Sequence, residues 1–167
     1  MRRRIFKSTF LSNFVVKNLI MNITIKELTT LEEMLAHIDT MKFLYPNLTV
    51  EKYNANLLEM IPRNYTQIAV FEEDRCLGLT GLWTATKLWT GKYLELDNFV
   101  VNPDYRSKGI GKMLTDYANQ KAHDLGCSSI VLDAFTGNFG AHRFYYNQGY
   151  GPKGFHFVKI IDESKLA

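Results

Sequence analysis

The sequence predicts a single α/β domain built around a mixed β-sheet. The chain has 167 residues, which is the size of one compact domain with a real core. Its middle third contains three strand-like segments joined by short turns, which favours an antiparallel meander. Downstream of these, helical and strand patterns alternate. The predicted order is β-α-α-β-β-β-α-β-α-β, and the sequence contains no internal repeat or low-complexity linker.

The first part of the predicted domain is a strand followed by two helices. Apolar residues alternate over residues 23–28, which predicts a strand. Residues 30–33 match the S/T-x-x-E capping box, in which side chains at both ends satisfy unpaired amides. Apolar residues then recur at helical spacing: Leu31, Met34, Leu35, Ile38 and Met41. This spacing predicts one helix ending before Pro46, and a second, shorter helix follows over residues 50–61.

The central meander is predicted over residues 67–72, 76–86 and 92–101. Glu73-Asp74 and Thr90-Gly91 separate these strands and are typical of turns. Such short links imply antiparallel neighbours.

The C-terminal part alternates between helix and strand. Apolar residues from Ile110 onward have helical spacing and this helix closes at Gly126. Residues 129–134 are mostly apolar, which predicts a strand buried on both faces. Residues 141–149 then predict a helix, and residues 155–161 predict the last strand.

The basic charge of the chain is concentrated at its start. Five of the 20 Lys and Arg residues lie within residues 1–20, which contain no Asp or Glu, so the rest has 15 basic against 17 acidic residues. This balance argues against nucleic acid as a partner, and no apolar run is long enough to span a membrane. Residues 1–20 are therefore predicted to be an extension, either a targeting segment or the product of an upstream start with Met21 as the natural one. Residues 21–167 form the domain.

The cysteines and histidines give no sign of a metal site. Cys76 and Cys127 stand far apart with no CxxC spacing, which favours reduced thiols and a cytoplasmic location. The four histidines do not cluster in the sequence: His37, His123, His142 and His156. We expect His123 and His142 to face solvent, and His156 is a candidate for the wall of an acceptor pocket.

The loop at residues 102–112 has the features of a phosphate site. Gly109 and Gly111 let the backbone approach a ligand closely, and the helix that follows presents unpaired amides at the positive end of its dipole. Arg106 and Lys108 add positive charge beside them. The arrangement suits a pyrophosphate, and the alternative is a tight turn that only starts a helix.

Two other phosphate-binding motifs do not fit this loop. A Walker loop, GxxxxGK[ST], would need glycine where Arg106 stands and Ser or Thr where Met113 stands. A dinucleotide fingerprint, GxGxxG, would need glycine in place of Leu114.

Two separate motifs resemble those of the GNAT superfamily of acyl-CoA-dependent N-acetyltransferases. Residues 101–111 match V-x-P-x-x-R-x-x-G-x-G, and residues 138–150 match N-x-x-A-x-x-F-Y-x-x-x-G-[FY]. The motifs occur in the family's order with the expected strand between them. The resemblance covers residues 21–161 and implies a mixed, mostly antiparallel sheet of six to seven strands flanked by about four helices. It also implies that the strands at residues 92–101 and 129–134 splay apart to hold the cofactor.

The resemblance implies that acetyl-CoA is the cosubstrate, and the scattered cysteines and histidines indicate that no metal takes part. Backbone groups of three residues would pair with the pantetheine arm: Phe99, Val100 and Val101. Amides of the loop would hold the pyrophosphate, from Arg106, Ser107, Lys108, Gly109, Ile110, Gly111 and Lys112. Asn138 would contact the cofactor arm, and Tyr145 would lie near the thioester sulfur.

The same resemblance implies how the reaction would proceed. Tyr145 would protonate the leaving sulfur, and an amide within residues 98–101 would bond the carbonyl oxygen as it gains charge. Glu95 and Asp97 alternate with leucines, so both carboxylates face one side of their strand. We rank Asp97 first as general base, although both carboxylates could equally belong to a solvated strand face. The pair at residues 98–99, Asn-Phe, departs from the acidic-aliphatic pair common in the family, which leaves the base open.

The sequence therefore predicts an N-acetyltransferase that joins acetyl-CoA and a primary amine in a ternary complex. The acidic pair favours a small cationic amine as acceptor. The alternatives are a protein N-terminal or lysine acetyltransferase, and a non-catalytic acyl-CoA-binding module. The chain would act as a monomer or a homodimer. An exposed Trp89 beside the acceptor cleft is the aromatic side chain best placed for a binding role.

Overall fold

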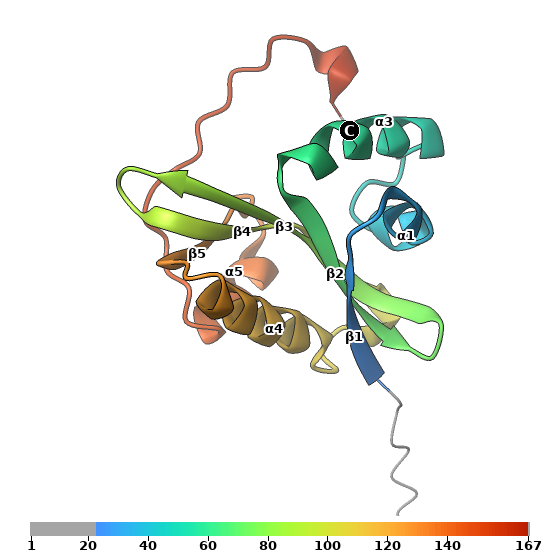
Figure 1. Cartoon of the computed structure of the whole chain (residues 1–167), viewed down its shortest axis with the longest axis horizontal. Helices are drawn as coiled ribbons and strands as arrows, with labels where there is room; N and C mark the ends of the chain where they lie inside the picture. The colour runs from blue at the N-terminus through green and yellow to red at the C-terminus, as the bar shows by residue number, and fades with distance from the viewer. Residues whose placement is uncertain (1–22, 167) are drawn as a thin grey trace, which may run out of the picture.

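The computed structural model describes residues 23–166 as an open five-stranded sheet with helices on both faces (Figure 1). The predicted extension, residues 1–20, lies outside the described part of the chain. The strands are arranged in the order β1-β2-β3-β4-β5. All neighbours are antiparallel except β4 and β5, which run parallel. The mixed α/β sheet predicted from the sequence is thus confirmed.

The first strand and the capping box form as predicted. Strand β1 spans Ile23–Leu28, and helix α1 (Leu31–Leu35) begins after Thr30. The Thr30 hydroxyl accepts a hydrogen bond from the Glu33 amide at 3.2 Å, and the Thr30 amide donates to Glu33 Oε2 at 3.0 Å. These reciprocal bonds satisfy amides that would otherwise be unpaired at the start of the helix.

The prediction of a single helix over residues 31–41 is wrong. The structure has two helices there, α1 and α2 (Ile38–Met41). At the break, each amide bonds to the carbonyl three residues earlier instead of four. The His37 amide donates to the Met34 carbonyl at 3.2 Å, and the Thr40 amide donates to the His37 carbonyl at 3.0 Å. The divided helix buries the side chains of Met34, Ile38 and Met41 together against the sheet.

The second predicted helix is confirmed as α3 (Val50–Met60), which continues into the short 3-10 helix η1 (Ile61–Arg63). The Thr49 hydroxyl caps α3 by accepting from the Lys52 amide at 3.2 Å. Helix α3 buries Leu57 and Tyr53 in the same layer as α1 and α2.

The antiparallel meander is confirmed, and it contains a bulge. It consists of β2 (Tyr65–Glu72), β3 (Arg75–Lys87) and β4 (Gly91–Val101). Leu79 pairs with Val100, whereas Gly81 pairs with Asp97, so a single residue of β3 faces two residues of β4. The bulge therefore lies at residues 98–99 of β4.

Gly81 lies beside this bulge and has no room for a side chain. A Cβ atom added there would collide with the phenol ring of Tyr65, which is almost completely buried. The ring of Tyr65 also packs on that of Trp83, with the two centroids 4.8 Å apart. Aromatic side chains therefore fill the space beneath the sheet at this point.

The C-terminal half follows the predicted order as far as its second helix. The 3-10 helix η2 (Pro103–Tyr105) leads into α4 (Ile110–Asp124), β5 (Ser129–Leu132) and α5 (Phe139–Asn147). Buried residues of α4, such as Leu114 and Ala118, pack on the face of the sheet opposite α1–α3. No helix within residues 23–166 is long and apolar enough to cross a membrane.

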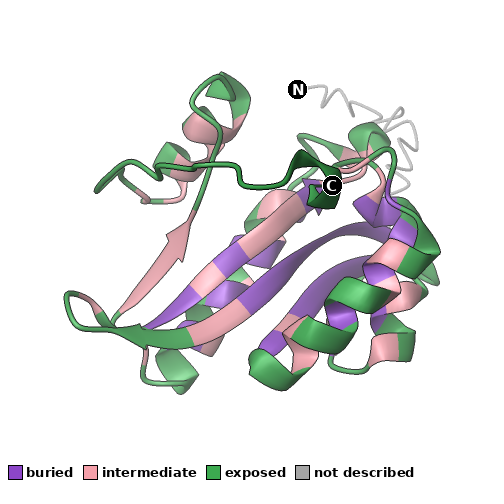
Figure 2. Cartoon of the chain, turned by 90° about the horizontal axis from the view of Figure 1, so that it is seen from above, coloured by how far each residue is buried: buried purple, intermediate pink, exposed green. Residues whose placement is uncertain are grey.

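The last predicted strand, residues 155–161, is wrong. The segment has no regular secondary structure and pairs with no strand among residues 23–166, and it is followed by the short 3-10 helix η3 (Glu163–Lys165). The sheet consequently has five strands rather than six or seven, and β5 lies at its edge. For the same reason β5 is half-buried rather than buried on both faces, as the burial colours of Figure 2 show.

Candidate active site

Strands β4 and β5 separate along their length. They pair from Tyr93 and Ser129 to Leu96 and Leu132, where the pairing ends. Strand β4 continues to Val101, so from Asp97 onward its edge toward β5 has no neighbouring strand among the described residues. This edge presents backbone N–H and C=O groups to whatever enters the opening. The splayed pair predicted from the resemblance is present.

The bulge of β4 lies at the point where the two strands part. Asn98 has a left-handed backbone with φ of +53°, a conformation that asparagine adopts more readily than most residues. Its Oδ1 accepts a hydrogen bond from the Tyr45 hydroxyl at 2.7 Å. The Thr80 hydroxyl donates to the Asp97 carbonyl at 2.9 Å. Hydrogen bonds from Tyr45 and from Thr80 thus hold the bulge in place. A bulge turns backbone N–H and C=O groups out of the regular pairing between strands.

The loop between β4 and α4 leaves the start of the helix open. Gly109 precedes α4 with φ of +87°, and no side chain caps the first amides of the helix. The loop residues 106–109 are exposed. The positive end of the α4 dipole therefore faces solvent with unpaired N–H groups, which is the arrangement that binds phosphate elsewhere.

The loop, the edge of β4 and α5 meet at Gly111. A Cβ atom added to Gly111 would lie 3.1 Å from two ring atoms of Phe144 and 3.7 Å from the ring of Phe99. The rings of Phe99 and Phe144 are 5.7 Å apart by their centroids. Gly111 is needed for this close approach, because a side chain there would crowd the ring of Phe144.

Tyr145 lies in an aromatic cluster at the opening. Its ring is 5.9 Å from that of Phe99, 5.2 Å from that of Phe144 and 5.8 Å from that of Tyr150. Burial, with a smaller contribution from the charge of Tyr150, raises the pKa of Tyr145 to about 12. The phenol is therefore protonated at neutral pH and is able to donate a proton.

Asn138 has a structural function of its own in the free protein. It is the N-cap of α5, where its Oδ1 accepts from the Ala141 amide at 3.1 Å. Its side-chain NH₂ group is left for other partners.

The two candidate carboxylates differ in their surroundings. Asp97 Oδ2 accepts a hydrogen bond from the indole nitrogen of Trp83 at 3.0 Å, which fixes its orientation. Glu95 is half-buried, and this burial is the main reason that its pKa is raised. The negative charges of Asp133 and Asp97 raise it further, while Lys87 acts in the opposite direction. The sequence did not single out Trp83 as a positioning residue or Asp133 as a neighbour.

The histidines are placed by the structure as follows. His156 Nδ1 lies 2.6 Å from Asp133 Oδ2, beside Glu95. His123 is exposed as expected. His142 is partly exposed, and its Nε2 lies 2.9 Å from the Phe135 carbonyl. His37 packs on the ring of Phe71. Within residues 23–166, no three His, Cys, Asp or Glu side chains come together as a metal site would require.

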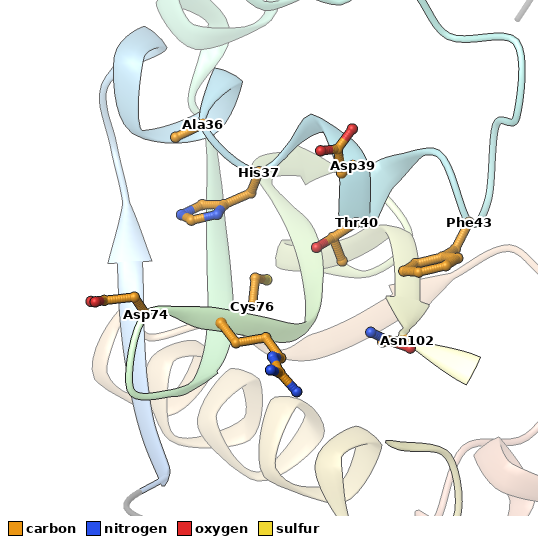
Figure 3. Close-up of a pocket in the computed structure, with 9 residues that line it drawn as sticks. Ala36, His37, Asp39, Thr40, Phe43, Asp74, Cys76 and Asn102 are labelled. Atoms are coloured by element: carbon orange, nitrogen blue, oxygen red, sulfur yellow. The ribbon is translucent and has the colours of Figure 1, made fainter. Parts of the chain in front are cut away.

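A cavity of about 300 Å³ lies elsewhere, between α2 and the start of β3 (Figure 3). His37, Thr40 and Cys76 line it, together with Arg75 and Asn102. It contains none of the side chains predicted to take part in catalysis or cofactor binding. The candidate active site is instead the open edge of β4, where the bulge, the loop and Tyr145 converge.

Comparisons with known proteins identify the family of the chain. The model of the acetyltransferase (GNAT) family matches residues 31–150. An uncharacterised N-acetyltransferase of Bacillus subtilis, YhdJ, is 30% identical over 83% of this chain and 99% of its own length. The aminoalkylphosphonate N-acetyltransferase of Salmonella typhimurium is 28% identical over 65% of this chain and 70% of its own.

A solved structure shares the fold. The aminoglycoside N-acetyltransferase AAC(6')-Iy, in complex with CoA, superposes with a TM-score of 0.73. The match covers 84% of this chain and 95% of that one, at 15% identity.

Proposed function

This chain belongs to the acetyltransferase (GNAT) family and is an N-acetyltransferase, and from that premise we propose that it moves an acetyl group from acetyl-CoA to a small cationic amine. The observation that carries the proposal is the unpaired edge of β4 beside the uncapped start of α4. A cofactor with an amide-containing arm and a pyrophosphate has groups that complement both features.

The cofactor would lie along the opening between β4 and β5. Its pantetheine amides would pair with the backbone of residues 99–101, as an added strand does. Its pyrophosphate would accept hydrogen bonds from amides of residues 106–112 at the start of α4. The Asn138 side-chain NH₂, which the cap of α5 does not use, would donate to the arm.

The bulge would stabilise the charge that develops on the thioester oxygen. When the amine nitrogen attacks the carbonyl carbon, the oxygen becomes negative and needs a donor already in position. An amide at residues 98–99 is the nearest candidate, because the bulge turns backbone groups away from β3. The Tyr45 and Thr80 hydrogen bonds would keep this donor fixed.

Tyr145 would act as the general acid. As the C–S bond breaks, the electron pair goes to sulfur, and the phenol proton would follow it to give the neutral thiol of CoA. A pKa of about 12 keeps this proton on Tyr145 until the sulfur needs it. General-acid catalysis of this kind contributes roughly 10²- to 10⁴-fold.

Glu95 would take a proton from the ammonium group of the acceptor, directly or through water, and the neutral amine would then attack the thioester carbon. The sequence ranked Asp97 first, but two features favour Glu95 in that role. Burial raises the pKa of Glu95, which makes its carboxylate a stronger base, whereas Asp97 already accepts the Trp83 indole N–H. Asp97 would then hold the cationic acceptor.

The acceptor class is inferred from charge and from the relatives. Glu95, Asp97 and Asp133 gather negative charge beside the opening, which would attract a positively charged amine. The Salmonella relative is named for an aminoalkylphosphonate and the structural neighbour for aminoglycosides, both of which carry amino groups. We place the reaction in the cytoplasm, because Cys76 and Cys127 are both free thiols.

A peptide amine is the second candidate acceptor. Leu88 and Trp89 stand exposed together at the tip of the β3–β4 hairpin, where they would suit the side chains of a longer substrate.

Release of CoA from acetyl-CoA should be measured over a panel of polyamines, aminoglycosides, aminoalkylphosphonates and lysine-containing peptides. The proposal predicts turnover with at least one small cation and little with peptides. Turnover confined to peptides would favour the second candidate. Tight acetyl-CoA binding with no turnover on any amine would contradict both.

A further inference from the structure

The hydroxyl of Tyr150 is buried and has no hydrogen-bond partner in the described part of the chain. A hydroxyl shut away from water without a partner lowers stability, so most buried hydroxyl groups are paired. Phenylalanine would fill the same space without this cost, and the motif at residues 138–150 accepts either residue there. The unpaired hydroxyl therefore points to a partner outside the folded chain.

Tyr150 is part of the aromatic cluster at the opening between β4 and β5. It follows the end of α5, where its amide donates to the Tyr145 carbonyl at 3.0 Å. Its ring is 5.8 Å from the ring of Tyr145, which in turn is 5.9 Å from the ring of Phe99 on the unpaired edge of β4. Tyr145 thus connects Tyr150 to this edge, and Tyr150 belongs to the wall of the opening that α5 provides.

The pantetheine arm has more polar groups than the edge of β4 can pair. A chain that joins a sheet edge as an added strand still has N–H and C=O groups on its other side. These groups need partners from the opposite wall, which is that of α5. Asn138 precedes α5 and Tyr150 follows it, so polar side chains lie at both ends of this helix.

We propose, on the basis of the function proposed above, that the Tyr150 hydroxyl binds the pantetheine arm and donates to an amide carbonyl there only when the cofactor is present. The partly buried ring of Tyr145 would turn aside to let the arm reach this hydroxyl, a side-chain change of the kind common on binding. Binding would then give the hydroxyl its hydrogen bond and at the same time remove the cost of leaving it unpaired.

Replacing Tyr150 by Phe should have opposite effects on the free protein and on the complex. The free variant lacks the unpaired hydroxyl, so its Tm should rise by about 2–4 °C. Its affinity for acetyl-CoA should fall about tenfold, because the carbonyl of the arm is then left unpaired. CoA contains the same amides and should lose as much affinity. Since the contact is the same before and during the reaction, kcat should be nearly unchanged.

ADP is the matched ligand control, because it has a pyrophosphate but no pantetheine arm. Its affinity, measured by calorimetry, should be the same for the wild-type chain and for Tyr150→Phe. Tyr117→Phe is the matched variant, since the Tyr117 hydroxyl has a partner and donates to Glu27 at 2.8 Å. Its loss should lower Tm and leave the binding of all three ligands unchanged.

The outcomes separate this assignment from the proposed function. Unchanged binding of acetyl-CoA and CoA by Tyr150→Phe would overturn the assignment, and so would a lower Tm, because the hydroxyl would then have a partner within the chain. A loss confined to acetyl-CoA would also overturn it, since the partner would be the thioester and not an amide. A wild-type chain that binds neither CoA nor ADP would instead contradict the proposed function.

Discussion

The hydroxyl of Tyr45 donates a hydrogen bond of 2.7 Å to the side-chain oxygen of Asn98, across 53 positions of sequence. The contact ties the segment after α2 to the one non-glycine residue of β4 whose backbone is left-handed. Since the amides beside Asn98 are the proposed donors to the thioester oxygen, Tyr45 would position a catalytic group without touching the substrate.

Replacing Tyr45 by Phe should lower kcat about 3- to 10-fold. The change removes one hydrogen bond, which is worth about 0.5–1.5 kcal/mol, and leaves the ring in place. Glycine at position 98 adopts a positive φ without strain, so the bulge should then no longer need the Tyr45 hydrogen bond. We therefore expect Tyr45→Phe combined with Asn98→Gly to lose no more activity than Asn98→Gly alone. If the losses of kcat in the two single variants multiply in the double variant, Tyr45 and Asn98 act independently.

Replacing Tyr145 by Phe should lower kcat about 100-fold and leave the Kd for acetyl-CoA nearly unchanged. The change removes the proton that the departing sulfur would take, but keeps the ring contacts with Phe99 and Phe144. Tyr146→Phe is the matched control, since Tyr146 is the next residue of α5 and is exposed. Steady-state kinetics with calorimetry would check both variants. An unaltered kcat would remove Tyr145 from the mechanism.

Replacing Glu95 by Gln should remove the acidic limb of the pH profile of kcat/KM and lower its plateau about 100-fold. That limb should lie above the ordinary range of a glutamate, because burial raises the pKa of Glu95. Asp97→Asn should retain the limb and raise KM for the amine. The opposite pattern would return the base to Asp97, the first choice from the sequence.

The same Glu95→Gln change should stabilise the fold at neutral pH. A carboxyl whose pKa is higher in the folded than in the unfolded state contributes stability at low pH that is lost as the pH rises through the folded value. At pH 7 the folded wild-type chain therefore contains a half-buried ionised carboxylate, which lowers its free energy of unfolding, and the variant does not. Denaturant melts should show the gain at pH 7 and a smaller gain below about pH 4.3, the unfolded value. A gain independent of pH would mean that burial of the charge is not its cause.

Gly109 and Gly126 provide a controlled test of the loop. Both have a positive φ, +87° and +68°, with no atom within 4 Å of an added Cβ, and they lie at opposite ends of α4. Alanine at either position should cost stability by a similar amount, about 1 kcal/mol. Only Gly109→Ala should also weaken acetyl-CoA binding, by about tenfold or more, as measured by calorimetry. Equal binding by the two variants would contradict a pyrophosphate site at this loop.

The sequence predicted best those features of the fold that depend on residues close together in the chain. The capping box at Thr30, the glycines of the loop and the short turns of the meander each act within a few residues, and each is in place in the structure. The two motifs that resemble the GNAT family also placed the opening between β4 and β5 correctly.

The features that sequence reasoning missed depend on contacts between distant residues. The bulge was not predicted, although Asn98 was noticed as unusual, because its cause includes Tyr45 and the missing side chain of Gly81. The break between α1 and α2 lies at the three-residue hydrogen bonds around His37, and the helical spacing of Met34, Ile38 and Met41 gives no sign of it. Residues 155–161 have the composition of a strand, but composition cannot reveal whether a partner strand lies beside them.

The collision expected between a Cβ at Gly81 and the ring of Tyr65 makes these two positions a coupled pair. Because Gly81 lies opposite Asp97, any redesign of substrate preference that enlarges residue 81 must also shrink residue 65. Single-site mutagenesis would score every change at 81 as harmful and would miss such combinations. Libraries that vary both positions together would reach them, and they offer a route to new acceptors that leaves Glu95 and Tyr145 untouched.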